Sequence, residues 1–167
     1  PFVHGEEPQE LFARTEEALA YAAARGANSW YATRTEDKES TRSSLQWRRL
    51  LRKAGRRGRL QLAFYPVVDA REGTLLHREG MVRLQADAED SGKLLTAGEF
   101  MPMAEHLNLI ASIDLQTARL AIEKLGEMDG MVAINLSAAT IADFGFRHDF
   151  MQLLQAHPER AARLMIE

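Results

Sequence analysis

A buried strand is predicted by Met131-Val132-Ala133-Ile134-Asn135-Leu136-Ser137, because a compact apolar run of this length is typical of the interior of a sheet. A helix is expected over 150–156, and Pro158 ends it. Leu164-Met165-Ile166-Glu167 then has the composition of the next strand. Strand, helix and strand in this order predict a parallel α/β architecture, either a barrel or a doubly wound sheet.

Two more strands are expected upstream of this unit, and they are close enough in sequence to form an antiparallel hairpin. The first covers 60–68, where apolar and polar residues alternate and Pro66 takes an irregular or edge position. Residues 69–73 form the turn, and 75–84 form the second strand. The sheet therefore combines an antiparallel pair with later parallel strands.

Helices are expected between the hairpin and the 131–137 strand. Thr96 and Glu99 have the spacing of a capping box, and Pro102 either opens the main helix or ends a preliminary turn. Residues 112–125 then have the apolar spacing of an amphipathic helix.

The N-terminal part of the chain has a different organisation. A helix is expected over 8–25, ended by Gly26, and a short strand over 27–32. Residues 33–41 are polar without periodicity and are interpreted as a linker, and a second helix covers 43–54.

Composition excludes several classes of protein. The chain has 167 residues, a formal charge of −3 and no cysteine, so disulfide scaffolds, cysteine-ligated zinc sites and thiol nucleophiles are excluded. No apolar run is long enough to span a bilayer. The sequence begins with Pro1 instead of Met, which suggests a fragment of a longer protein.

Positive charge is concentrated in one segment. Residues 42–59 contain eight basic residues and no acidic one. Such a run marks either a nucleic-acid or membrane-surface patch, or a solvated helix that pairs with acidic neighbours. We favour the solvated helix and expect no nucleic-acid partner, because Trp47 alone does not supply the aromatic side chains that stack on bases.

Three polar side chains occupy apolar strands or their ends, namely Glu79, Asn135 and Glu167. In an α/β barrel, such groups at the carboxyl ends of strands face a shared site, and carboxylate and amide oxygens suit Mg²⁺ or Mn²⁺. Arg83 follows Glu79 on the same strand face, about 13 Å along, where a fixed cation would hold a phosphate. The alternatives are a solvent-facing or salt-bridged glutamate and an asparagine that caps the strand end.

Four ordered motifs make the pattern specific. They are Phe64-Tyr65-Pro66-Val67-Val68-Asp69, Glu79-Gly80-Met81-Val82-Arg83, Gly98-Glu99-Phe100-Met101-Pro102-Met103-Ala104-Glu105 and Asn135-Leu136-Ser137. From about Leu45 to its last residue the chain resembles the first part of an EAL domain, the cyclic-di-GMP phosphodiesterase family.

The N-terminal segment resembles the closing helix and strand of a GGDEF domain, through residues 18–22 and 26–30. The signature loop of that family is absent, so we expect no cyclase activity from this chain. The resemblance divides the chain into the C-terminal end of a GGDEF-like domain (1–35), a basic connector helix (36–59) and the N-terminal part of an EAL domain (60–167).

The EAL resemblance implies a modified TIM barrel with one antiparallel strand, of which only the first part is present. It also implies metal-assisted hydrolysis of one phosphodiester of cyclic-di-GMP to the linear dinucleotide, with Mg²⁺ or Mn²⁺. Glu79 would be catalytic and a metal ligand together with Asn135 and Glu167, and Arg83 would contact the ligand phosphate. Tyr65 replaces a glutamine of the family and would alter a contact to the ligand or to the catalytic glutamate.

Departures from the family pattern keep other functions open. Gly80 and Met81 replace an alanine and a leucine after the motif glutamate, and the paired aspartates, lysine and final glutamate of the family would lie beyond Glu167. A catalytically inactive cyclic-di-GMP receptor, of the degenerate GGDEF–EAL (LapD) type, is therefore the alternative, and a scaffold without a ligand is a third. The resemblance implies a cytoplasmic location and leaves open a homodimer and a membrane-anchored parent protein.

Overall fold

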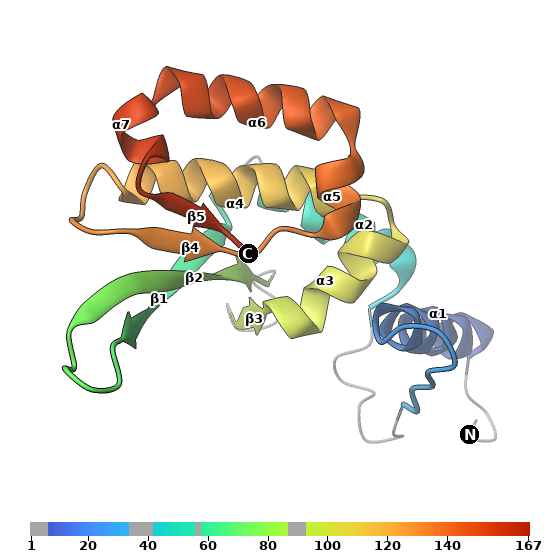
Figure 1. The fold of residues 1–167 in the computed structure, drawn as a ribbon. Helices are drawn as coiled ribbons and strands as arrows, with labels where there is room; N and C mark the ends of the chain where they lie inside the picture. The colour runs from blue at the N-terminus through green and yellow to red at the C-terminus, as the bar shows by residue number, and fades with distance from the viewer. Residues whose placement is uncertain (1–6, 34–41, 56–57, 87–92) are drawn as a thin grey trace.

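A five-stranded sheet with the order β1-β2-β4-β5 organises the chain, and β3 pairs with β2 away from this path (Figure 1). The structure is a computed structural model that describes residues 7–33, 42–55, 58–86 and 93–167. The strands are β1 (Leu60–Val68), β2 (Leu75–Gln85), β3 (Leu94–Thr96), β4 (Val132–Ile134) and β5 (Leu164–Ile166). The helices are α1 (Pro8–Ala24), α2 (Ser44–Ala54), α3 (Ala97–His106), α4 (Ile110–Lys124), α5 (Ala138–Ala142), α6 (Phe144–Ala156) and α7 (Pro158–Ala161).

The expected hairpin is confirmed: β1 and β2 pair antiparallel, with Tyr65 opposite Glu79. Its turn is closed by Asp69, whose carboxylate accepts the backbone N–H groups of Arg71 and Glu72 at 2.8 and 2.9 Å. Pro66 is tolerated because β1 lies at the edge of the sheet, where a missing N–H leaves no neighbouring strand unpaired.

The expected parallel part of the sheet is confirmed as well. Strand β2 pairs parallel with β4, and β4 pairs parallel with β5. The predicted strand 131–137 is longer than the observed β4, because Ser137 is the N-cap of α5 and the chain must leave the sheet to begin that helix. Neither β3 nor the short helices α5 and α7 were expected from the sequence.

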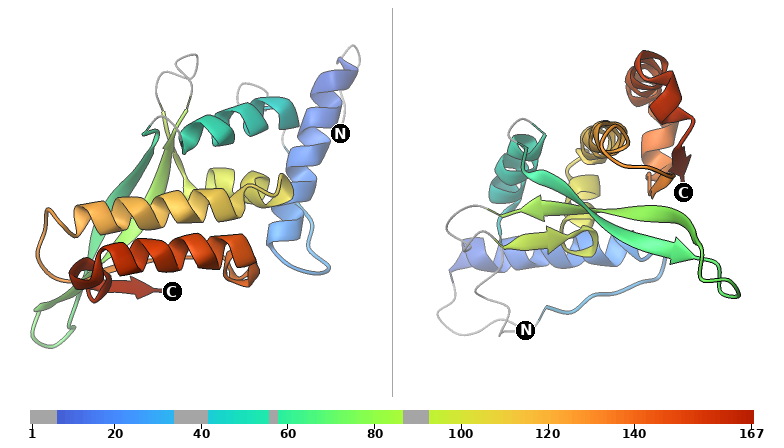
Figure 2. Two further views of the ribbon diagram at one scale, coloured as in Figure 1. Left: turned by 90° about the horizontal axis from the view of Figure 1, so that it is seen from above. Right: turned by 90° about the vertical axis from the view of Figure 1, so that its left-hand side faces the viewer.

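Helices α4 and α6 pack side by side over β4 (Figures 1 and 2). The cluster beneath them includes Val132 and Ile134, which are fully buried on this face of the sheet. Since side chains alternate along a strand, Ala133 lies on the opposite face, together with its register partner Glu79. The sheet thus has one helix-covered apolar face and one face that carries the candidate site. Parallel strands that follow an antiparallel first strand are the architecture expected for the first part of a modified TIM barrel, and the short β3 adds a second antiparallel pairing with β2.

A second apolar cluster joins the N-terminal helices to the hairpin. It contains buried side chains of α1, α2, β1, β2 and α3. The expected helix 43–54 is confirmed as α2, which begins with a reciprocal capping box between Ser43 and Gln46. Helix α1 contacts α3 through Tyr21, whose hydroxyl donates to the Glu99 carbonyl at 2.6 Å, and burial raises the pKa of that hydroxyl.

Two local predictions are wrong. The short strand expected over 27–32 does not form, because Gly26 and Asn28 have φ values of 99° and 59°, which are incompatible with an extended chain. Pro102 neither opens the main helix nor ends a preliminary turn but lies inside α3. The carbonyl of Gly98, which Pro102 leaves without its helical N–H partner, belongs to an exposed residue that water can reach. The expected linker residues 34–41 lie outside the described residues.

Gly80 gives a prediction about stability. A Cβ atom added there would lie 3.4 Å from both the Ala133 carbonyl oxygen and a Phe64 ring carbon, which is ordinary contact, and its φ is not in the left-handed region. Gly80→Ala should therefore raise the free energy of unfolding by about 0.5–1 kcal/mol, because alanine loses less conformational entropy than glycine. Urea denaturation measures the change, and an equal or lower stability would show that the strand does not accept the methyl group.

Candidate functional site

The candidate site lies on the uncovered face of the sheet, towards the carboxyl ends of its parallel strands. Glu79 is in β2, Asn135 directly follows β4, and Glu167 directly follows β5. The Asn135 amide nitrogen donates to the Glu79 carboxylate at 3.1 Å, although the two residues are 56 positions apart in sequence. The backbone N–H of Glu167 donates to the Ile134 carbonyl at 3.0 Å, which places Glu167 beside Asn135. The structure thus gathers the three residues that the sequence singles out.

Arg83 and Tyr65 extend the same face along the hairpin. Arg83 is four residues beyond Glu79 and so points to the same side of β2, while Tyr65 lies directly opposite Glu79. The Arg83 guanidinium donates to the Tyr65 hydroxyl at 3.2 Å and to the Val82 carbonyl at 3.0 Å. Tyr65 is 51% exposed, so its ring and the cation beside it are accessible to a ligand.

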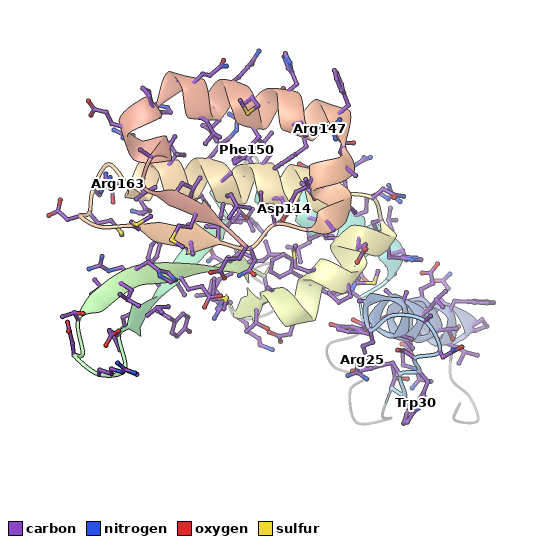
Figure 3. The ribbon with its side chains drawn as sticks, in the orientation of Figure 1. Arg25, Trp30, Asp114, Arg147, Phe150 and Arg163 are labelled. Carbon is purple, nitrogen blue, oxygen red and sulfur yellow. The ribbon has the colours of Figure 1, made fainter. Side chains whose placement is uncertain are left out.

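The segment 135–137 is fixed by one contact at each of its residues. The Asn135 side chain donates a hydrogen bond to Glu79, and the Leu136 N–H donates to the Glu167 carbonyl at 3.0 Å. The Ser137 N–H donates to the Asp114 carboxylate at 3.0 Å. Asp114 lies on α4, next to this segment (Figure 3). Its burial raises its carboxyl pKa, an effect that Thr140 and the Ser137 N–H oppose.

Asp114 is the residue of this region that the sequence analysis missed. The spacing of the sequence could have revealed it, because Asp114 lies three, four and seven residues before Thr117, Ala118 and Ala121. All four side chains are buried on one stripe of α4. A charged residue on the buried stripe of an amphipathic helix requires a polar partner, and here the partner comes from a distant loop.

The oxygen atoms of the site are of the kinds that coordinate a hard divalent cation. Glu79 and Glu167 supply carboxylate oxygens and Asn135 supplies an amide oxygen, which are ligands that Mg²⁺ and Mn²⁺ prefer. Within the residues that the structure describes, no group of three or more His, Cys, Asp or Glu side chains is placed to hold a metal. These residues therefore fit part of a coordination shell, and other oxygens must complete it.

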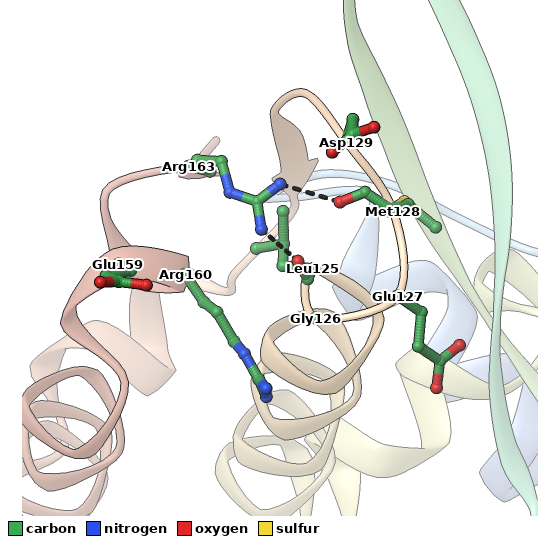
Figure 4. Close-up of a pocket in the computed structure, with 8 residues that line it drawn as sticks. All are labelled: Leu125, Gly126, Glu127, Met128, Asp129, Glu159, Arg160 and Arg163. Atoms are coloured by element: carbon green, nitrogen blue, oxygen red, sulfur yellow. Dashed lines mark hydrogen bonds between the residues drawn. The ribbon is translucent and has the colours of Figure 1, made fainter.

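A hollow of about 440 Å³ lies at the other end of the sheet, between the end of α4 and the region of α7 (Figure 4). The Arg163 guanidinium occupies one side and donates to the carbonyls of Leu125, Met128 and Gly130, the last two at 2.8 and 3.2 Å. Leu125 is the C-cap of α4, where a helix leaves carbonyls unpaired, and Met128 and Gly130 lie in the loop that leads to β4. We therefore assign Arg163 a structural role.

Comparison with known proteins identifies relatives of this chain. A bifunctional diguanylate cyclase/cyclic di-GMP phosphodiesterase of Pseudomonas aeruginosa, MucR, is 27% identical over 98% of the chain. The solved PaMucR phosphodiesterase, in complex with c-di-GMP, is 28% identical over 72% of the chain, with a TM-score of 0.62. The S helix-GGDEF-EAL part of Vibrio cholerae LapD, bound to c-di-GMP, shares the fold with a TM-score of 0.81 at 22% identity over 96% of the chain.

The chain spans only part of each of these proteins: 24% of the curated MucR sequence, 50% of the solved PaMucR chain and 39% of the LapD chain. No helix among the described residues is long and apolar enough to cross a membrane. The sequence profile of the EAL domain matches residues 48–167, which is well over half of the chain. The chain therefore belongs to the EAL domain family.

Proposed function

We propose that this chain contributes the first part of a metal-dependent phosphodiesterase site that hydrolyses cyclic-di-GMP to the linear dinucleotide. The observation that carries the proposal is the 3.1 Å contact between Glu79 and Asn135, two polar side chains from different strands at one edge of a parallel sheet. Membership of the EAL family and the c-di-GMP complex of PaMucR support the choice of ligand.

Each residue of the site has a proposed role. Glu79, Asn135 and Glu167 would hold Mg²⁺ or Mn²⁺, and Glu79 is the residue on which catalysis depends most. The bound ion would lower the pKa of a water molecule and offset charge that develops on the phosphate. Arg83 would hold a phosphate oxygen by charge-assisted hydrogen bonds, and Tyr65 would orient the Arg83 guanidinium and contact the ligand.

The second candidate function is a receptor that binds cyclic-di-GMP without cleaving it. Two departures from the family pattern favour it. Gly80 stands beside Glu79 where the family has alanine, and glycine weakens a strand interior. Tyr65 stands where the family has glutamine, and its hydroxyl accepts a hydrogen bond from the Arg83 guanidinium. A receptor needs Arg83 and the neighbouring surface, whereas hydrolysis also needs Glu79 to hold a metal.

We further propose the domain division that the sequence suggests, with residues 1–35 as the end of a GGDEF-like domain, 36–59 as a connector and 60–167 as the EAL part. A cytoplasmic site of action follows from cyclic-di-GMP as the ligand, and homodimerisation stays a prediction.

Calorimetric titration of cyclic-di-GMP into the full-length protein with Mn²⁺, followed by chromatography of the product, tests the proposal. Binding with conversion to the linear dinucleotide supports the phosphodiesterase. Binding without conversion supports the receptor, and absence of binding contradicts both functions.

Arg83→Ala should weaken cyclic-di-GMP binding by about 10- to 100-fold, because hydrogen bonds to charged groups contribute about 1.5–3 kcal/mol. A calorimetric titration without divalent cation, which leaves the ligand intact, measures the change. Arg78→Ala is the matched control, since Arg78 lies on the same strand but donates to the Asp129 carbonyl at 2.9 Å. Equal losses in both variants would show that Arg83 has no specific contact with the ligand.

A further inference from the structure

We propose that Asp114 is a positioning residue, which holds the β4–α5 segment so that Asn135 faces Glu79. The inference rests on the proposed function, because it matters only if Asn135 serves the site. It assigns a functional role to a side chain of α4 that lies outside the sheet and its strand ends.

The first observation is the burial of an acidic side chain. Asp114 is 2% exposed, and a carboxylate removed from water is costly unless a polar group compensates it. An apolar residue at this position would complete the buried stripe of α4 at lower cost. The chain instead keeps an acid here, and the hydrogen-bonding partner of that acid indicates its use.

The second observation is what the carboxylate binds. Its oxygen accepts the Ser137 N–H at 3.0 Å, and Ser137 is also the N-cap of α5, where its hydroxyl accepts the Ala139 N–H at 3.2 Å. Asp114 therefore fixes the residue at which the chain turns from the end of β4 into the next helix.

The third observation is the short distance in sequence from that point to the candidate site. Asn135 is only two residues before Ser137, and the Leu136 N–H between them is held by the Glu167 carbonyl. The backbone of 135–137 is thus fixed to β5 on one side and to α4 on the other. Without the Asp114 carboxylate, the Ser137 N–H loses its partner and the segment loses its hydrogen bond to α4.

Substitutions at Asp114 separate positioning from general stability. Asp114→Ala removes the acceptor, whereas Asp114→Asn keeps an oxygen of the same size in the same place. Thr117→Val is the matched control: Thr117 is 3% exposed on the same helix, and its hydroxyl donates only within α4, to the Ile113 carbonyl at 3.0 Å. That variant loses a buried hydrogen bond within α4 and leaves the bond between Asp114 and Ser137 in place.

The affinity for Mn²⁺ alone is the first measurement, made by calorimetry on the full-length protein. Loss of a residue that orients a metal ligand typically costs 10- to 100-fold in metal affinity, so we expect Asp114→Ala to bind Mn²⁺ about tenfold more weakly or worse. We expect Asp114→Asn and Thr117→Val to stay within about threefold of the unmodified protein. Equal metal affinity in Asp114→Ala and Thr117→Val, after similar losses of melting temperature, would overturn the proposal.

Amide hydrogen exchange, followed by NMR, is the second measurement and does not depend on a metal. Asp114→Ala should speed exchange at residues 135–137 at least tenfold relative to Thr117→Val, and Asp114→Asn should restore protection. Unchanged exchange there would overturn the role of Asp114. If the unmodified protein binds no Mn²⁺ but the exchange result holds, the proposed function fails while Asp114 still fixes the segment.

Discussion

Glu79→Gln should lower kcat/KM for cyclic-di-GMP hydrolysis by at least about 100-fold, which is the largest functional effect expected of this chain. Removing a residue that only orients a metal ligand already costs 10- to 100-fold, so replacing a ligand should cost at least as much. Glutamine keeps the shape of the side chain and an oxygen but loses the negative charge that neutralises a divalent cation.

Glu72→Gln is the control for this prediction, because Glu72 is an exposed carboxylate in the turn of the same hairpin. Steady-state assays with chromatographic detection of the linear dinucleotide compare the two variants. Full activity in Glu79→Gln would remove Glu79 from the catalytic site, and an equal loss in both variants would indicate a general effect of charge.

Phe100→Ala should lower the free energy of unfolding by about 3–5 kcal/mol, the largest effect on stability that we expect. Phe100 is fully buried on α3 and belongs to the cluster that joins α1 and α2 to the hairpin. The change removes most of a large side chain, and the surrounding residues relax only partly into the cavity that it leaves.

Phe144→Ala is the matched control, because Phe144 is 78% exposed at the start of α6. Its stability should stay within about 0.5 kcal/mol of the unmodified protein. Urea denaturation measures both variants, and similar losses would show that the cluster around Phe100 does not stabilise the chain more than the surface does.

The sheet could be predicted from the sequence because its signals are local. The alternation over β1 and the turn at Asp69 predict a hairpin, and the apolar runs before Asn135 and Glu167 predict parallel strands. Element ends were less predictable. Strand β4 ends before the predicted residue because Ser137 caps a helix. Residues 27–32 are not a strand, because the backbone has positive φ at Asn28 and at Gly26 just before the segment.

The candidate site was predictable in its residues but not in its contacts. Glu79 and Asn135 stand out as polar groups in apolar strands, and the family motifs add Arg83 and Tyr65. The hydrogen bond between Glu79 and Asn135 depends on the register of β2 and β4, which no local pattern determines. The contact of Asp114 with Ser137 joins a helix to a distant loop, and only the folded chain brings the two together.

The most direct test of the central claim is diffraction from crystals of the full-length protein grown with Mn²⁺ and cyclic-di-GMP, measured at the manganese absorption edge. We predict an anomalous peak within coordination distance of oxygens of Glu79 and Asn135, with a phosphate of cyclic-di-GMP or of its linear product close to Arg83. A bound ligand with its manganese elsewhere, or a ligand that does not reach this edge of the sheet, would contradict the assignment of the site.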